Sequence, residues 1–239
     1  MPESLEDFLM TRPPTAERPL LGQTVLVVED SRFACEALRM ICQRSGARIR
    51  RADSLKSAAR HLRTYRPGIV LIDLGLPDGS GLELIHDLAT AAPRINVIMA
   101  MSGDDTAGEI AIANGADAFI PKPIKSISAF QATVLAALPK DARPTGLRPV
   151  SKDAISPDRI ALRDDLALAA DLLAHDVDAA TLHYVTSFLI GLAKVAEDPE
   201  LGDIARALER TCAKGSPSND SLHRLKTAVQ KRLNTEQSV

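Results

Sequence analysis

Aromatic side chains are scarce in this sequence of 239 residues: they make up 3% of the chain, and there is no tryptophan. Carbohydrate sites and base-stacking surfaces depend on aromatic faces, so the composition argues against both. The cysteines, at positions 35, 42 and 212, are few and odd in number and lack the spacing of a metal site. A reduced, cytoplasmic setting is the simplest interpretation.

Excess charge and long apolar runs are also missing. The formal net charge is −2, so no global field would draw the chain to nucleic acid. No apolar run approaches the roughly 20 residues that cross a bilayer, and the acidic start MPESLEDFLM lacks the order of a signal peptide. We therefore expect a cytoplasmic protein without a membrane partner.

What is present is an alternation of strand and helix patterns. Short β-branched runs such as 25–28 and 69–73 suit strands that are buried on both faces, and segments of helical periodicity separate them. Strands are expected at 25–28, 47–52, 69–73, 95–101 and 116–120, and helices at 31–45, 55–65, 82–91, 105–114 and 124–138. This order predicts an α/β fold with a five-stranded, parallel, doubly wound sheet of flavodoxin-like type.

Composition changes suggest the domain limits. A proline-rich flexible tail is expected over 1–21, the α/β domain over 22–139, a linker over 140–156, and an all-helical region over 157–235. Four amphipathic segments make up the last part, where Ser156-Pro157 and Asp198-Pro199 are typical helix starts.

Ligands of open parallel sheets gather at the carboxyl ends of the strands. The groups expected at that edge are three carboxylates, a hydroxyl, a glycine amide and an ammonium: Glu29, Asp30, Asp73, Ser102, Gly103 and Lys122. Each residue alone fits an ordinary loop or helix cap. Their joint arrival at one edge indicates a site.

Four motifs carry a family resemblance: VLVVED at 25–30, DLGLPDGSG at 73–81, MSG at 101–103 and FIPKP at 119–123. In this order and spacing, residues from about 22 to 140 resemble the receiver domain of two-component response regulators. The resemblance implies that Asp73 accepts a phosphoryl group from a sensor histidine kinase or a phosphotransfer protein. The resemblance implies a signalling protein and not a metabolic enzyme, although proteins of this family can dephosphorylate themselves.

The resemblance also implies the other roles. Mg²⁺ would be held by Asp30, Asp73 and the Gly75 carbonyl, with Glu29 acting mostly through water, which suits a hard cation that prefers oxygen. Lys122, Ser102 and the Gly103 amide would contact the phosphoryl oxygens. The switch pair would be Ser102 and Phe119, where the family more often has tyrosine at the second position.

The helical region is less informative. Its four apolar stripes would make a thin core on their own, so we expect a homodimer through about 157–234. Two alternatives stay open. A DNA-binding regulator is possible but not favoured, because the loop at 215–220 before the basic last helix is long for a helix-turn-helix. A phosphorelay module is suggested only by the sequence HRLK at 223–226 and by the other helix histidines, His175 and His183.

Overall fold

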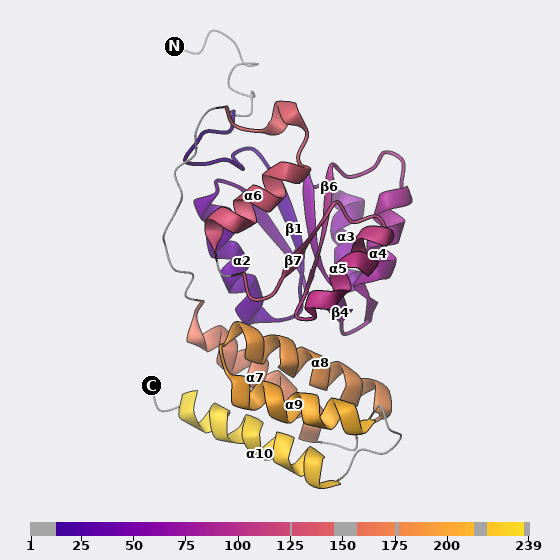
Figure 1. Cartoon of the computed structure of the whole chain (residues 1–239), viewed down its shortest axis with the longest axis vertical. Coiled ribbons are helices and arrows are strands. Elements are labelled where there is room, and N and C mark those ends of the chain that lie inside the picture. Colours follow the sequence, from indigo (N-terminus) through magenta and orange to yellow (C-terminus); the bar gives the residue numbers. More distant parts are fainter. Residues whose placement is uncertain (1–12, 125, 146–156, 175–176, 213–218, 237–239) are drawn as a thin grey trace.

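The structure is a computed structural model that describes residues 13–124, 126–145, 157–174, 177–212 and 219–236. Strands and helices alternate through its first half (Figure 1). The strands are β1 (Thr24–Val28), β2 (Arg48–Ala52), β3 (Ile69–Asp73), β4 (Gly75–Leu76), β5 (Gly79–Ser80), β6 (Val97–Ser102) and β7 (Ala118–Pro121). The helices are α2 (Arg32–Arg44), α3 (Leu55–Thr64), α4 (Gly81–Thr90), η1 (Asp105–Ala107), α5 (Gly108–Ala113), α6 (Ile127–Ala137) and η2 (Lys140–Ala142).

Five strands form one sheet in the order β2-β1-β3-β6-β7, and every pairing in it is parallel. This confirms the predicted α/β fold. The expected helix at 105–114 is divided: Asp104 caps the short η1 by accepting from the Thr106 amide, and α5 starts only at Gly108. The two-residue strands β4 and β5 pair antiparallel in the loop after Asp73.

Two apolar clusters cover the two faces of the sheet. Val25, Leu71 and Met99 pack with α2 and α6 on one face, and alternate residues of the same strands pack with α3, α4 and α5 on the other. Strand β3 is buried along its whole length, which explains its continuous apolar sequence. Its last residue, Asp73, is thereby carried to the carboxyl edge of the sheet.

Part of the segment expected to be a flexible tail is packed against the α/β domain. Leu20 is fully buried in the cluster between the sheet, α2 and α6, and its amide donates to the Ser45 carbonyl. The start of the expected linker is also anchored, because the Arg143 guanidinium donates to the carbonyls of Ala136 and Leu138 at the end of α6. Residues 1–12 and 146–156 lie outside the described residues.

The described residues of the second half form four helices: α7 (Arg159–Ala174), α8 (Ala179–Val195), α9 (Pro199–Cys212) and α10 (Asn219–Glu236). They share one core, to which each predicted stripe contributes; its fully buried members include Ala169, Val185, Ala205 and Val229. Asp198 holds two of the helices together: it accepts from the Leu201 amide in α9 and from the Arg232 guanidinium of α10. No helix among the described residues is long and apolar enough to cross a membrane.

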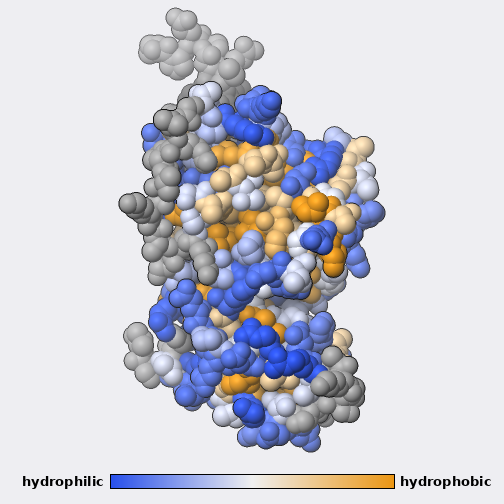
Figure 2. Space-filling view, in the orientation of Figure 1, coloured by the Kyte–Doolittle hydropathy of each residue, from blue (hydrophilic) through white to orange (hydrophobic). Residues whose placement is uncertain are grey.

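The helical region lies against the carboxyl edge of the sheet, with α7 and α8 nearest to it (Figure 1). Phe33 of α2 joins the apolar cluster of these helices and is 6% exposed. Figure 2 shows apolar residues gathered on one face of the α/β domain, over β7 and α6, whereas this side of the helical region is mainly hydrophilic. The edge where the sequence predicted a site therefore lies between the two halves of the chain.

Candidate functional site

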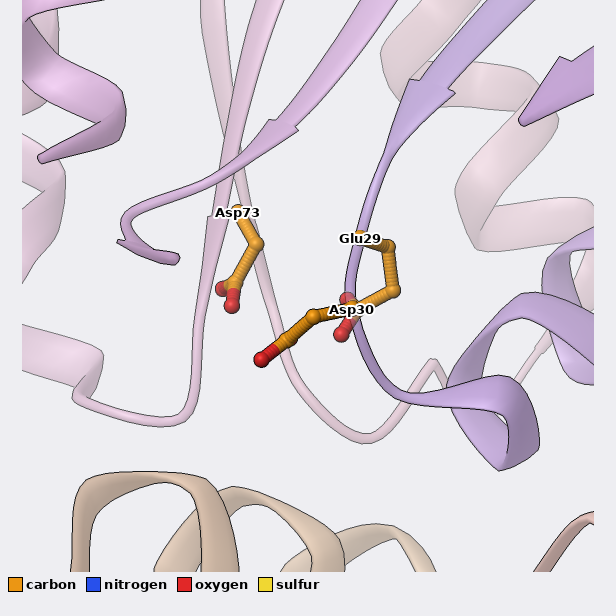
Figure 3. Close-up of side chains that lie close together, drawn as sticks. All are labelled: Glu29, Asp30 and Asp73. Atoms are coloured by element: carbon orange, nitrogen blue, oxygen red, sulfur yellow. The ribbon is translucent and has the colours of Figure 1, made fainter. Parts of the chain in front are cut away.

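The predicted carboxylates converge. Glu29 and Asp30 follow β1 and Asp73 ends β3, its neighbour in the sheet, and Figure 3 shows the three side chains pointing toward one another. One carboxylate oxygen from each lies within 4.8 Å of the others. The residues are 1%, 8% and 8% exposed, respectively. A buried cluster of like charges is costly unless cations compensate it.

Lys122, which follows β7, supplies one compensating charge. Its Nζ lies 2.5 Å from Glu29 Oε2 and 2.8 Å from Asp73 Oδ1. Its backbone amide donates to the Ser102 carbonyl at 2.8 Å, which fixes the lysine beside the end of β6. The residues from three strand ends thus form one ionic network, as the motif spacing predicted.

The pKa values reflect both burial and charge. Burial raises the pKa of Asp30 to about 6, against the opposing hydrogen bond from Tyr184, and raises that of Asp73 to about 6, against the opposing charge of Lys122. Burial also raises the pKa of Glu29. For Lys122, burial alone would lower the pKa, but Asp73 and Glu29 outweigh it and raise the pKa, so the ammonium persists at neutral pH.

A hard divalent cation fits this donor set. With all groups ionised, three carboxylates and one ammonium leave two negative charges in the network, and carboxylate oxygens are the ligands that Mg²⁺ prefers. Gly75 lies beside them in the wall of the same cavity. The donor set fits the predicted metal, whose ligands would be Asp30, Asp73, the Gly75 carbonyl and Glu29.

The loop after Asp73 depends on Gly81. A Cβ atom at this position would lie 2.1 Å from the Asp73 carbonyl oxygen, so a side chain there would displace the acceptor strand. The Gly81 amide also donates to the Leu74 carbonyl at 3.1 Å. Only glycine lets α4 begin this close to Asp73.

The predicted switch residues occupy two neighbouring strands. Ser102 ends β6, and its Oγ accepts from the Asp104 amide at 3.0 Å, with Gly103 between them in the cavity wall. Phe119 lies in β7 and is partly buried; it packs so close to α5 that a Cβ on Gly108 would lie 3.1 Å from its ring. The aromatic ring is thus under the first turn of α5, one strand away from the serine.

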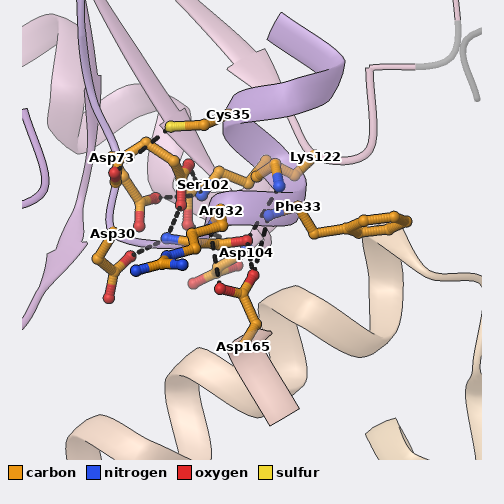
Figure 4. Close-up of polar contacts among 12 residues, drawn as sticks. Asp30, Arg32, Phe33, Cys35, Asp73, Ser102, Asp104, Lys122 and Asp165 are labelled. Atoms are coloured by element: carbon orange, nitrogen blue, oxygen red, sulfur yellow. Dashed lines mark hydrogen bonds and ion pairs between the residues drawn. The ribbon is translucent and has the colours of Figure 1, made fainter. Parts of the chain in front are cut away.

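Asp165, Tyr184 and Lys194 of the helical region make polar contacts at this site, and none of the three was predicted from the sequence. Asp165 of α7 accepts from Ser31 Oγ at 2.7 Å and from the amides of Arg32 and Phe33 at 2.9 and 3.0 Å, at the first turn of α2 (Figure 4). Burial raises the pKa of Asp165. The one sequence signal was an acidic residue beside Leu166, on the buried side of an amphipathic helix.

The other two residues come from α8. The Tyr184 hydroxyl donates to Asp30 Oδ2 at 2.6 Å. Lys194 Nζ donates to the Gly103 carbonyl at 2.7 Å and lies 2.9 Å from Asp105 Oδ1. Tyrosine and lysine are common on helix surfaces, so the sequence held no signal for either contact.

Beside these contacts, a cavity of about 520 Å³ lies between the acidic cluster and the helices. Asp73, Ser102 and Lys122 line it from the sheet, and Ser187 and Arg206 are among the residues that line it from α8 and α9. The site is therefore a chamber with two walls that come from different halves of the chain.

Comparison with known proteins agrees with this geometry. The sequence model of the response regulator receiver domain family matches residues 25–134. The KDP operon transcriptional regulatory protein KdpE of Escherichia coli is 30% identical over 128 residues, which are 54% of this chain and 56% of KdpE. The probable transcriptional regulatory protein TcrX of Mycobacterium tuberculosis is 35% identical over 101 residues, 42% of this chain and 43% of TcrX.

Among solved structures, the CheY-like receiver domain from Methylobacillus flagellatus has 27% identity and a TM-score of 0.44 and covers 48% of this chain and 98% of its own. The chain spans about half the length of the curated relatives it matches. The family match, the sheet order and the convergence of the motif residues agree on one assignment. Residues 25–134 of this protein are a response regulator receiver domain.

Proposed function

We propose that this protein is a two-component response regulator in which Asp73 accepts a phosphoryl group from a sensor histidine kinase or a phosphotransfer protein. The observation that supports it best is the position of Asp73, whose carboxylate belongs to the acidic metal-type cluster and lies 2.8 Å from the Lys122 ammonium. The resulting phosphoryl group would change how the helical region pairs with itself or with a partner.

Each residue of the site has a separate role in the phosphoryl transfer. An Asp73 carboxylate oxygen attacks phosphorus, and the bond from phosphorus to the donor histidine nitrogen breaks, with the electron pair leaving on that nitrogen. Lys122, already beside Asp73 Oδ1, pairs with the transferred oxygens as a fixed positive charge. The Ser102 hydroxyl and the Gly103 amide offer hydrogen bonds to the same oxygens. Mg²⁺, when bound by Asp30, Asp73, Gly75 and Glu29, neutralises charge on these oxygens.

Labelling with acetyl phosphate and Mg²⁺ tests the acceptor. Asp73→Asn should abolish the acid-stable, base-labile label of an acyl phosphate, and Asp30→Ala should remove the Mg²⁺ dependence. Asp87→Asn, an exposed position on α4, is the matched control and should label normally. Label that persists on another carboxylate of the Asp73→Asn variant would contradict the assignment.

The label also distinguishes a phosphorelay module. His183 and His223 are exposed on α8 and α10, while His175 lies outside the described residues. A phosphohistidine is acid-labile and base-stable, opposite to an acyl phosphate. An acid-labile label in full-length protein that His223→Ala or His183→Ala removes would favour the phosphorelay alternative.

DNA binding remains the less favoured output. The relatives KdpE and TcrX are named transcriptional regulatory proteins, and the last helix here carries the cations Arg224, Lys226, Lys231 and Arg232. One of them, Arg232, is held by Asp198 and by Glu200 Oε2 at 3.0 Å. Heparin retention of the full chain, with and without a phosphoryl donor, tests this output: salt-sensitive retention that follows phosphorylation would favour DNA.

A cytoplasmic location remains our proposal. It rests on the three free cysteines, Cys35, Cys42 and Cys212, which suit a reducing compartment.

A further inference from the structure

The helical region closes the chamber over Asp73. The acceptor is 8% exposed, and the wall opposite it belongs to α8 and α9. A Cβ atom on Gly103 would lie only 3.6 Å from the Gly191 Cα atom, so the backbone of α8 runs directly along the end of β6. A donor as large as a protein cannot bring a phosphohistidine to Asp73 while these helices stay in place.

Polar contacts hold the helices on both sides of the chamber. On the α2 side, Asp165 accepts from the amides of Arg32 and Phe33, and the Tyr184 hydroxyl donates to Asp30 Oδ2. On the opposite side, Lys194 bridges the Gly103 carbonyl and Asp105. Phe33 adds an apolar anchor in the core of the helical region. The contacts therefore span the pocket from the β1 end to the β6 end.

Two of these contacts compete with what the pocket is proposed to bind. Both Asp30 oxygens already have donors: the Ser31 amide on Oδ1 at 3.0 Å and Tyr184 on Oδ2 at 2.6 Å. A cation at Asp30 would compete with the tyrosine for that oxygen. Lys194 holds the carbonyl that follows Ser102, in the loop that must rearrange if Ser102 and the Gly103 amide are to turn toward a phosphoryl group.

We propose that α7 and α8 act as an intramolecular gate on the phosphoacceptor pocket, held shut by Tyr184 and Lys194 and opened when a divalent cation and a phosphoryl group occupy the pocket. This proposal rests on the proposed function, because the cation and the phosphoryl group that open the gate are the ligands of that function. Because each ligand binds the open form better, removal of a gate contact must also strengthen ligand binding.

The test uses the full chain and two readouts: Mg²⁺ affinity by calorimetry, and the radius of gyration in solution with no ligand, with Mg²⁺, and with Mg²⁺ and beryllofluoride as phosphoryl mimic. Tyr184→Phe removes the contact with Asp30, and Lys194→Met removes the contacts with Gly103 and Asp105; both substitutions change the side-chain volume little. Their matched controls are His183→Ala on the exposed face of α8 and Lys231→Met on the exposed face of α10.

The gate predicts that Tyr184→Phe binds Mg²⁺ roughly tenfold to a hundredfold more tightly than wild type, which corresponds to the loss of one competing hydrogen bond to a charged group. Both gate variants should expand in ligand-free buffer, and wild type should expand with Mg²⁺ and beryllofluoride, while the controls match wild type. Weaker Mg²⁺ binding by Tyr184→Phe would overturn the gate and make the tyrosine a support for the metal ligand.

The failures can be told apart. Compact gate variants that bind Mg²⁺ like wild type would refute the gate and leave the proposed function standing. No Mg²⁺ or beryllofluoride binding by any variant would refute the proposed function together with ligand-driven opening.

Discussion

Replacement of Asp165 should lower the free energy of unfolding, because this side chain joins the helical region to the α/β domain. In the folded protein this carboxylate is 1% exposed and accepts from Ser31 Oγ and from two amides of α2. Hydrogen bonds to a charged acceptor contribute about 1.5–3 kcal/mol each, so a simple sum would reach roughly 4.5–9 kcal/mol. That sum is too large, because burial raises the pKa of Asp165 and thus offsets part of the gain.

The geometry separates two substitutions at this position. Asp165→Asn keeps one acceptor oxygen but turns an amide group toward one of the two backbone N–H donors, so one buried donor is lost, at about 1–2 kcal/mol. Asp165→Ala leaves both amides and the serine hydroxyl without their acceptor and should cost about 2–4 kcal/mol. Urea unfolding followed by far-ultraviolet circular dichroism measures both values.

The adjacent residue provides the control. Asp164 pairs with Arg32 at 2.6 Å, but the two side chains are 34% and 60% exposed. An exposed pair of this kind contributes about 0–1 kcal/mol, so Asp164→Ala should unfold nearly like wild type. The reasoning fails if Asp165→Ala is within about 0.5 kcal/mol of Asp164→Ala, or if asparagine is as harmful as alanine.

Three further predictions concern the rest of the molecule. The Arg232 hydrogen bond lowers the pKa of Asp198, so Asp198→Asn should lower the free energy of unfolding by about 1–2 kcal/mol at neutral pH. The difference in stability between the variant and wild type should shrink as acid protonates Asp198 below its usual pKa of 3.8, which unfolding midpoints across pH measure. Gly75 has no side chain to shield the acceptor from water in the chamber, and Asp104 lines that chamber, so the acyl phosphate should last minutes, and Asp104→Ala should prolong it; equal decay of the label would exclude a role in water orientation. The homodimer stays a prediction, to be checked by sedimentation of the full chain at tens of micromolar, where a monomer with and without beryllofluoride would refute it.

The packing of the helical region removes one reason for a dimer. The sequence suggested that four stripes of about 80 residues need a second copy for burial. In the structure these stripes bury one another, and Phe33 from the receiver domain fills part of the same core. Self-association would therefore have to use residues left outside, such as Ile160 and Leu168 on α7, which are 62% and 42% exposed.

Sequence patterns predicted the sheet and the acidic cluster for one physical reason. Parallel strands place their carboxyl ends at one edge, so the residues that follow β1, β3 and β7 had to meet. The same reasoning could not find Tyr184 or Asp165, because their partners lie 154 and 134 residues away and the docking of α7 and α8 leaves no period in the sequence. Leu20 was missed because two adjacent leucines after several prolines resemble a tail, and the sequence does not show that the Leu20 amide donates to the Ser45 carbonyl.

Phe33 has a consequence for anyone who divides this chain into parts. A fragment that stops in the linker would carry an exposed aromatic ring, and the amides of Arg32 and Phe33 would face water where Asp165 now accepts them. The fragment would contain the whole sheet and all four motifs, yet the first turn of α2 would lack the contacts that cover it in the full chain. The receiver domain that the motifs delimit is therefore smaller than the unit that packs together in the structure. An exchange of helical regions between such proteins must also transfer the apolar surface that contacts the Phe33 ring.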